Sequence, residues 1–456
     1  MSDDDLERRA RDLLDRAALA FRGHARAETW LRHHRVRLDE PLRVAVAGGP
    51  QTGKSTLVNA LIGEEVAPVR AGGAPVWFHD GTRPLARVRP LSAPEFVAPL
   101  ERSRPGHDVA VPETGAGSVV VEWPCRALRH TRLLETGADD ALTEADAVLH
   151  LVRHLGDPPS LPIGGAPPVH VMVLLSRADE LAGGKPDALL NAKRIARRRR
   201  KDPRVASLCQ DVLAISGRIA HAGRTLREDE YGVIAAIAGL PRADADAHLL
   251  SVDRFAGASF PLDIPASRRA GLLDRFGLGG VRLATTLCRS GARSRAALGE
   301  QLVRQSGLTE LQASISDLFT ARRGVLKARS ALIGLEHLLL AEPHPAAGAL
   351  AAELELVVAG AHAFRELRLL AGLRTGRVAL PGELAVEARR LIGGEGGAHC
   401  ERLGVEPQTP PERLWPAAER AAARWHEQTT GAGTAGGRRA AEVVLRSCTA
   451  ILDDLG

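Results

Sequence analysis

Residues 47–63 read AGGPQTGKSTLVNALIG, and this stretch decides the fold. The pattern GxxxxGK[ST], which is typical of a phosphate-binding loop, is satisfied by Gly48, Gly53, Lys54 and Ser55. A β-branched run, LRVAVAG from residue 42, precedes the pattern, and an apolar helical segment over 56–62 follows it. This strand, loop and helix order is the context that the motif requires, so we expect a nucleotide to bind here.

The residue types of the loop explain how it would hold phosphate. Glycine lets backbone N–H groups converge on phosphate oxygens at the start of the following helix. We expect Lys54 to span the β and γ phosphates and the Ser55 hydroxyl to bind Mg²⁺. The predicted contacts with the nucleotide phosphates comprise the whole loop and the first helical turn: Gly48, Gly49, Pro50, Gln51, Thr52, Gly53, Lys54, Ser55 and Thr56.

Length and composition indicate a globular protein of more than one domain. The 456 residues, 45% of them hydrophobic, allow about two or three domains with their own cores. Five scattered cysteines without a CxxC pair predict neither a disulfide framework nor a metal cluster. The N-terminus is charged from its third residue, and the charge-free run 158–176 contains five prolines, so we expect a cytoplasmic chain without a signal peptide or a transmembrane segment.

Three regions follow one another along the chain. Residues 1–40 have helical spacing and are expected to pack as an N-terminal helix on a helical bundle. Residues 41–262 alternate short apolar runs with helical stretches, which predicts an α/β P-loop domain with a mostly parallel sheet flanked by helices. The five strand-like runs begin at residues 42, 118, 147, 169 and 211. Residues 263–456 contain no further strand series, and they predict an α-helical bundle.

The net charge of +6 comes from arginine far more than from lysine. It is compatible with an anionic membrane surface, although a solvated arginine-rich surface explains it more simply. The run IARRRRK at 195–201 has the same two interpretations, a solvated helix end or an anion site. One tyrosine and eight phenylalanines offer no interleaved aromatic residues on which bases could stack, so no nucleic-acid partner is expected.

The helix after the loop, STLVNALIGEEVAP at 55–68, resembles the dynamin-like GTPases. Further stretches resemble the isoniazid-inducible group of bacterial dynamin-like proteins, and they lie at 183–210, 222–230, 272–284 and 302–332. The similarity covers most of residues 1–345. It implies a GTPase head on a helical neck and trunk, with GTP or GDP and Mg²⁺ as ligands. It also implies action at the cytoplasmic face of a membrane, through a lipid-binding tip, with a second dynamin-like protein or through self-association.

A second segment indicates which base is bound. Ser176-Arg177-Ala178-Asp179 ends a strand where a GTPase of this kind carries NKxD. The Asp179 carboxylate could accept the N1–H and amine protons of guanine, which adenine does not offer, or it could only cap the next helix. Arg177 could lie along the base, whereas Ser176 is too short to replace asparagine fully. In the corresponding base loop, Ser216 and Gly217 are candidate contacts.

Three departures from the resembling family predict weak hydrolysis. Residues 64–81 contain no Thr or Ser to close over Mg²⁺ as switch I does. Switch II, DTPG in the family, aligns with 122–125, where Glu122 is the candidate Mg²⁺ ligand and Cys125 replaces the mobile glycine. In the loop, Pro50-Gln51 replaces Gln-Ser, so one backbone donor is lost and Gln51 is left to position the catalytic water.

These observations leave three functional hypotheses. The first is a dynamin-like guanine-nucleotide-binding protein with weak or lost GTP hydrolysis that works with a dynamin-like partner. The second is an active mechanochemical GTPase that remodels membrane, with Gln51 and Glu122 as its catalytic residues. The third is a structural scaffold in which the phosphate loop is a vestige.

Overall fold

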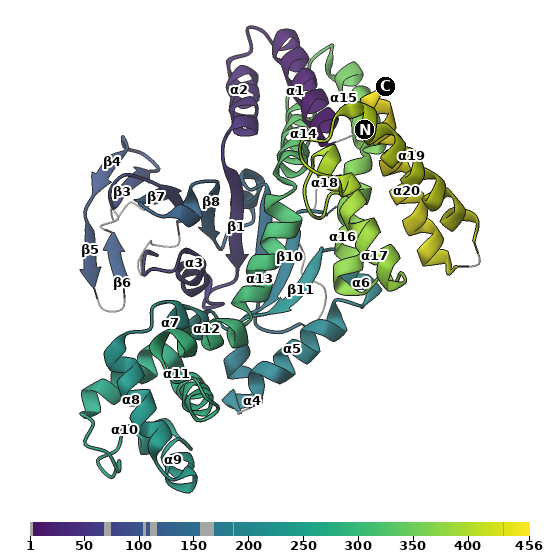
Figure 1. Ribbon diagram of the computed structural model, residues 1–456. Helices are drawn as coiled ribbons and strands as arrows, with labels where there is room; N and C mark the ends of the chain where they lie inside the picture. Colours follow the sequence, from purple (N-terminus) through teal and green to yellow (C-terminus); the bar gives the residue numbers. More distant parts are fainter. Residues whose placement is uncertain are drawn as a thin grey trace.

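A nine-stranded sheet forms the centre of the computed structural model (Figure 1), which describes residues 3–67, 74–103, 106–109, 116–155, 168–185, 187–431 and 433–456. The strands of the sheet are β1 (Leu42–Gly48), β2 (Val76–Asp80), β3 (Leu85–Pro90), β4 (Phe96–Ala98), β7 (Ala116–Trp123), β8 (Thr131–Thr136), β9 (Ala147–Val152), β10 (Val171–Leu175) and β11 (Asp211–Ala214). A separate hairpin consists of β5 (Leu100–Ser103) and β6 (Gly106–Val109).

The sheet is mostly parallel, as the sequence predicts. Its strand order is β11-β10-β9-β1-β8-β2-β7-β3-β4, and β1 pairs in parallel with both β8 and β9. All five strand-like runs of the sequence form strands, and the sheet also contains β2, β3, β4 and β8. Because the carboxyl ends of β1, β8, β9, β10 and β11 lie along one edge, the loops that follow them meet there, where ligands of open α/β sheets bind.

Both faces of the sheet are covered by helices. In β1, Val44 and Val46 belong to one hydrophobic core together with helix α3 (Lys54–Ile62). Ala45 and Ala47 belong to another core, which includes helix α5 (Ala188–Arg199). This alternation follows from the two-residue period of a strand. Since every residue of β1 is buried, the strand reads as a continuous apolar run.

The α-helices in the first 315 residues are α1 (Asp3–Ala20), α2 (Ala25–Asp39), α3 (Lys54–Ile62), α4 (Leu181–Gly184), α5 (Ala188–Arg199), α6 (Pro203–Ala206), α7 (Gly217–Arg224), α8 (Glu228–Gly239), α9 (Arg242–His248), α10 (Val252–Ala256), α11 (Ala266–Arg289), α12 (Arg295–Ser306) and α13 (Leu308–Ile315). The remaining helices are α14 (Arg323–Ala341), α15 (Ala347–Gly360), α16 (His362–Thr375), α17 (Gly382–Leu391), α18 (His399–Leu403), α19 (Pro411–Thr430) and α20 (Ala435–Leu455).

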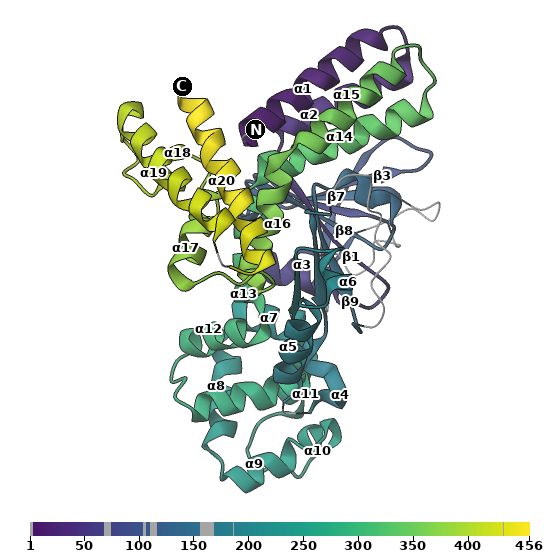
Figure 2. The same ribbon diagram turned by 90° about the vertical axis from the view of Figure 1, so that its right-hand side faces the viewer.

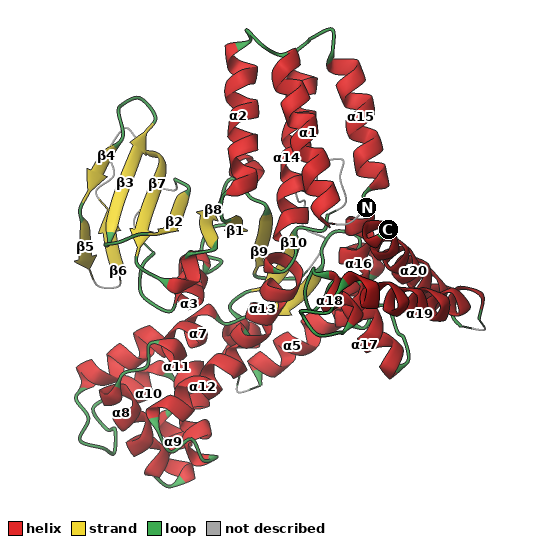
Figure 3. Cartoon of the chain, turned by 45° about the horizontal axis from the view of Figure 1, so that its top comes forward, coloured by secondary structure: helices red, strands yellow, loops and turns green. Residues whose placement is uncertain are grey.

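The helices form three groups around the sheet. Helices α1, α2, α14 and α15 project from one end as a long bundle, while α8 to α11 lie at the opposite end (Figures 1 and 2). Helices α16 to α20 form the third group, beside the bundle (Figure 3). Helices α7, α8, α11 and α12 share a core of their own, which includes Ile219, Ile234, Phe276 and Leu298.

The N-terminal region is two helices, because Gly23 takes a left-handed backbone (φ 91°) that turns α1 into α2. Both pack on α14, although almost 300 residues separate them in the chain. After α12 the chain returns to the sheet through α13, which contacts α3 and β11. The predicted domain boundary at residue 262 stays a prediction.

One helical stretch of the described residues, Ala347–Thr375, is long and apolar enough to cross a membrane by length and composition. The backbone breaks at Ala361, which separates α15 from α16. Inside α16, Glu366 is buried and accepts hydrogen bonds from Arg322 and Arg402. In this structure the stretch therefore forms two helices, of which α16 is largely buried and α15 is largely exposed.

Candidate functional site

The phosphate loop connects β1 to α3 and depends on two glycines. A Cβ atom on Gly48 would lie 2.5 Å from the Leu151 carbonyl oxygen, and the φ of Gly48 is 144°. Gly53 caps α3 with a left-handed backbone of φ 90°. A side chain at either position would strain the loop, so the loop geometry follows directly from the sequence motif.

Lys54 folds back over its own loop. Its Nζ donates to the carbonyl oxygens of Gly48 and Gly49, both at 3.0 Å. Burial lowers the pKa of Lys54, whereas the nearby Glu135 raises it. Phosphate oxygens would be stronger acceptors for this ammonium group than the two carbonyls are, because they carry charge.

Pro50 and Gln51 form the exposed tip of the loop. Gln51 has a positive φ of 57°, which costs a non-glycine residue about 1 kcal/mol or more. The Thr52 hydroxyl donates to the Gly49 carbonyl oxygen at 2.9 Å and closes the turn. Pro50 has no N–H, so the tip offers one phosphate donor fewer than a loop without proline.

The acidic residue next to the loop is Glu135, which is not among the site residues predicted from the sequence. The Ser55 hydroxyl donates to Oε1 of Glu135 at 2.6 Å. Glu135 lies near the end of β8, opposite Val46 in the adjacent strand β1. Burial raises the pKa of Glu135, although the Ser55 hydrogen bond and the Lys54 charge lower it.

This pair of oxygen atoms fits a magnesium ion. A hydroxyl and a carboxylate are the hard oxygen ligands that Mg²⁺ takes, with water and substrate phosphates completing its shell. A divalent cation here would favour the ionised form of the buried Glu135. The described residues contain no cluster of three or more acidic, histidine or cysteine side chains, so phosphate and water would have to supply the other ligands.

The structure does not bring Glu122, the predicted Mg²⁺ ligand, to the loop. Glu122 lies on β7 and accepts a hydrogen bond from Nε of Arg87 at 2.9 Å. Strands β8 and β2 separate β7 from β1, which corresponds to about 14 Å at the usual strand spacing. Cys125, expected in a switch loop, instead precedes the short helix Arg126–Leu128, and its N–H donates to Asp80.

Residues 135–138 occupy the position that the switch II prediction assigned to 122–125. A Cβ atom on Gly137 would lie 3.7 Å from the Gly48 carbonyl oxygen and 3.9 Å from Lys54 Nζ, so the turn after β8 touches the phosphate loop. The Thr136 hydroxyl accepts the Ala138 N–H at 3.0 Å and holds the turn. The signal in the sequence is an acidic residue followed by Thr-Gly at the end of TRLLET, 131–136.

A pocket at the same edge of the sheet joins the phosphate loop to the predicted base-binding residues. The predicted residues that line it are Thr52, Gly53, Thr56, Ser176, Arg177, Asp179 and Gly217. The Asp179 carboxylate is half-buried and has no hydrogen-bond partner among the described residues. Glu180 and Arg218, which are not among the predicted site residues, also line the pocket.

Ser176, Arg177 and Ser216, the other polar residues of the two base-recognition segments, form hydrogen bonds with other protein groups. The Ser176 hydroxyl donates to the Val152 carbonyl oxygen at 3.1 Å. Arg177 has a left-handed backbone (φ 49°), and its guanidinium donates to Glu180. The fully buried Ser216 hydroxyl accepts the Ile219 N–H at 3.2 Å and caps α7, so it is turned to the helix rather than to the pocket.

The predicted switch I segment, 64–81, is described in part. Residues 68–73 lie outside the described residues. At its start, the Asn59 side chain accepts the N–H groups of Val66 and Ala67, both at 2.8 Å, and so ties the segment to α3. At its end, residues 76–80 form β2.

Comparison with known proteins gives one strong relation. No family model matches the chain. The chain is 31% identical over 442 residues to the isoniazid-induced protein IniC of Mycobacterium tuberculosis, in strains CDC 1551 / Oshkosh and ATCC 25618 / H37Rv, with 89% of this chain and 90% of that protein covered.

Two solved chains from an oligomerised bacterial dynamin pair, described as sensing and tethering membranes over long range, resemble the chain weakly. The first has a TM-score of 0.33 and 11% sequence identity, with 100% of this chain and 75% of that chain covered. The second has a TM-score of 0.30 and 11% identity, with 94% and 91% covered.

Proposed function

Because this chain belongs to the family of the isoniazid-induced protein IniC, in the isoniazid-inducible group of bacterial dynamin-like proteins, we propose that it binds guanine nucleotide and hydrolyses it weakly or not at all. A single pocket carries this proposal, since it combines the phosphate loop with the carboxylate of Asp179, which has no hydrogen-bond partner among the described residues. The phosphates would lie on the loop and the start of α3, and the base on Asp179 and Arg177.

The preference for guanine rests on Asp179. A carboxylate accepts hydrogen bonds and, when ionised, donates none, so it suits the adjacent N1–H and amine of guanine. Adenine presents an acceptor at N1, which would face the carboxylate unpaired. The Asp179 side chain is available for this role because no described residue occupies it.

Mg²⁺ would be held by Ser55 and Glu135. The cation would supply charge neutralisation between the β and γ phosphates, and the two side chains would fix where it stands. Lys54 would leave its two carbonyl partners and donate to the phosphates. Glu135 therefore replaces Glu122 in the proposed Mg²⁺ site.

Weak hydrolysis is supported by three features of the loop and its neighbours. Ala138 stands three residues after Glu135, where the family pattern DTPG has a glycine, so a side chain restricts the backbone that would approach the γ phosphate. Pro50 removes a donor from the loop. Residues 64–81 offer no Thr or Ser as a switch I ligand.

We further propose action at the cytoplasmic face of a membrane, together with a second dynamin-like protein or a second copy of this chain. Exposed apolar side chains at the far end of the long bundle support the proposed contact with a membrane. There the α1–α2 turn meets the α14–α15 turn, with the Phe21 and His344 rings 4.5 Å apart, and Leu19 and Leu340 are 61% and 81% exposed. The net charge of +6 would favour an anionic surface.

Equilibrium binding of a fluorescent GTP analogue in the presence of Mg²⁺ tests the nucleotide proposal. We expect GTP and GDP to compete and ATP not to. We expect Lys54→Ala to weaken binding by about 100-fold, because a charge-assisted ammonium–phosphate hydrogen bond is lost. Multiple-turnover phosphate release then separates weak from full hydrolysis. If wild type fails to bind even at millimolar nucleotide, the loop is a vestige and the scaffold hypothesis stands.

A further inference from the structure

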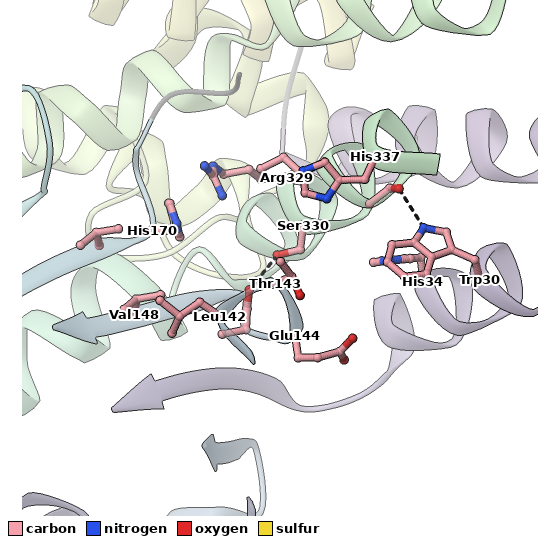
Figure 4. Close-up of a pocket in the computed structure, with 14 residues that line it drawn as sticks. Trp30, His34, Leu142, Thr143, Glu144, Val148, His170, Arg329, Ser330 and His337 are labelled. Carbon is pink, nitrogen blue, oxygen red and sulfur yellow. Dashed lines mark hydrogen bonds between the residues drawn. The ribbon is translucent and has the colours of Figure 1, made fainter. Parts of the chain in front are cut away.

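A cavity of about 240 Å³ separates α2 and α14 from the starts of β9 and β10, at the other edge of the sheet from the phosphate loop (Figure 4). His34, His170 and Arg329 line it. Arg329 already interacts with another residue, and the Trp30 indole donates to the Gly334 carbonyl oxygen at 2.8 Å, which joins α2 to α14. The cavity therefore belongs to the packing of the long bundle on the sheet.

A basic groove of about 490 Å³ lies elsewhere, where the end of α5 meets the end of α16. Arg197, Arg198, Arg200 and Lys201 form one wall, and the segment 373–376 forms the other. Helix α5 packs on the sheet, whereas α16 belongs to the third helix group (Figures 1 and 3). The basic groove shares no lining residue with the nucleotide pocket, so it is a separate region of the surface.

The two walls of the basic groove are held together by hydrogen bonds within the chain. Arg377, just after α16, donates to the Gln210 carbonyl oxygen at 2.6 Å, next to β11. Arg374, in the last turn of α16, donates to Asp317 at 2.5 Å and to the Ser314 hydroxyl at 2.7 Å. The groove is therefore preformed, as small-molecule sites usually are.

Three cations of the basic groove have no acidic partner. The side chains of Arg197, Arg198 and Lys201 are exposed, and they form no hydrogen bond or ion pair with a described residue. Lys201 follows both arginines by one turn, and like charges at this spacing repel. The dipoles of the two helix ends would offset about one unit of positive charge, since each end carries about half a unit. Positive charge therefore remains for a ligand to neutralise.

The acidic groups near the basic groove are engaged by its other two cations. Arg200 lies 3.7 Å from the Asp211 carboxylate and 3.8 Å from that of Glu310, while Asp317 pairs with Arg374. Asp211 is only 2% exposed, so it cannot reach the exposed cations. Arg200 forms no side-chain hydrogen bond with a described residue, and its guanidinium is therefore also available to a ligand.

Linked phosphoryl groups match this arrangement of charges. A guanidinium binds phosphate oxygens through two parallel hydrogen bonds, and an ammonium group binds phosphate as a point charge. One phosphoryl group carries a charge of about −1.5 to −2, which is too little to neutralise Arg197, Arg198 and Lys201 together. No carboxylate lines the groove to repel such a ligand, and the volume lies in the range of about 300–1,000 Å³ for small-molecule sites.

We propose that the basic groove binds a small soluble polyphosphate, an anion with two or three linked phosphoryl groups, on Arg197, Arg198, Arg200 and Lys201. With Arg374 on its other side, the ligand would stabilise the contact between α5 and α16. A lipid headgroup can carry the same phosphoryl groups. The groove, however, lies at the base of the third helix group, away from the far end of the long bundle, where the proposed membrane contact is (Figure 1).

Calorimetric titration with sodium tripolyphosphate, in about 0.15 M salt to screen distant charges, tests the proposal on the full chain. We expect a Kd of about 0.1 mM or below, and inorganic phosphate should bind at least about tenfold more weakly. Arg197→Gln/Lys201→Gln should weaken tripolyphosphate at least about tenfold. Arg194→Gln/Arg204→Gln is the matched control, because it removes two exposed arginines outside the groove, and it should bind as wild type does.

Two further measurements separate this site from the other proposals. With a chelator present, Lys54→Ala should still bind tripolyphosphate in the groove, so failure of the nucleotide proposal leaves this one standing. Cosedimentation with phosphatidylcholine vesicles, with and without cardiolipin, should be the same for wild type and Arg197→Gln/Lys201→Gln.

Three results would overturn the proposal. The first is that wild type does not bind tripolyphosphate at millimolar concentration. The second is that Arg197→Gln/Lys201→Gln binds it as tightly as the matched control does. The third is that Arg197→Gln/Lys201→Gln loses binding to cardiolipin vesicles, which would assign the basic groove to a lipid headgroup instead.

Discussion

At the scale of single residues, the Ser55 hydroxyl distinguishes two glutamates, each of which is the next-to-last residue of its strand. It donates to Glu135 on β8, whereas Glu122 on β7 pairs with Arg87. The two glutamates have the same position in their strands, so the partner of Ser55 depends on which of the two strands lies next to β1. That adjacency is a property of the sheet order and of no local sequence pattern.

Glu135→Gln should weaken nucleotide binding in the presence of Mg²⁺ by about tenfold or more and should have little effect in its absence, because the amide is a poorer ligand for the cation. Glu122→Gln is the matched control and should bind like wild type at both conditions. Fluorescent nucleotide titrations with Mg²⁺ and with a chelator measure this. A Mg²⁺-dependent loss in Glu122→Gln alone would restore the assignment made from the sequence.

Asp179→Asn should reduce the preference for GTP over ATP by about 10- to 100-fold, since hydrogen bonds to a charged partner contribute about 1.5–3 kcal/mol. Glu180→Gln is the control, because the neighbouring carboxylate is engaged with Arg177. Competition titrations with the two nucleotides give the ratio. An unchanged ratio in Asp179→Asn would mean that Asp179 only shapes the turn after β10.

At the scale of elements, the strand–loop–helix unit of β1 and α3 is the part that local sequence predicts best. Its glycines Gly48 and Gly53 lie at positions where the backbone has a positive φ, and both flanking elements have clear apolar patterns. Strand β8 was missed because its six residues include Arg132 and Glu135, which interrupt the apolar run. Ser216 was expected at the base, yet its hydroxyl caps α7.

Gly48→Ala should destabilise the fold and remove nucleotide binding, because its Cβ would meet the Leu151 carbonyl oxygen at 2.5 Å and its φ is 144°. We expect a loss of about 1–3 kcal/mol in the free energy of unfolding. Gly49→Ala is the control, since nothing lies within 4 Å of the position that its Cβ would take. Urea unfolding compares the two variants, and equal stabilities would contradict the close approach of β9 to the loop.

At the scale of the whole molecule, buried histidines link stability to pH. Burial lowers the pKa of His34 to about 3 and the pKa values of His79, His221 and His362 to about 4. Below about pH 6.5 the unfolded chain binds protons that the folded chain does not, so stability falls as the pH falls from there toward 3. The free energy of unfolding should therefore be lower in mild acid than at neutral pH.

His34→Phe should reduce this acid loss, because the substitution removes one group that is charged only in the unfolded chain. Within the window, each such histidine contributes about 1.4 kcal/mol per pH unit to the slope of the unfolding free energy. Chemical unfolding at a series of pH values from 7.5 to about 5 measures the slope for both proteins. Parallel slopes would show that His34 is protonated in the folded chain as well.

The sequence by itself determined the phosphate loop, the parallel core of the sheet and the helical character of the second half. These depend on residues that are neighbours in the chain: glycine at a left-handed turn, a short continuous apolar run in a buried strand, and helical spacing. The tertiary structure alone decided that Glu135 faces Ser55, that α1 and α2 pack on α14, and that His34, His170 and Arg329 share a cavity. Those contacts join residues that are about 80 to 300 positions apart in the chain. Strand order and helix packing bring such residues together, and both are determined by the burial of the whole core.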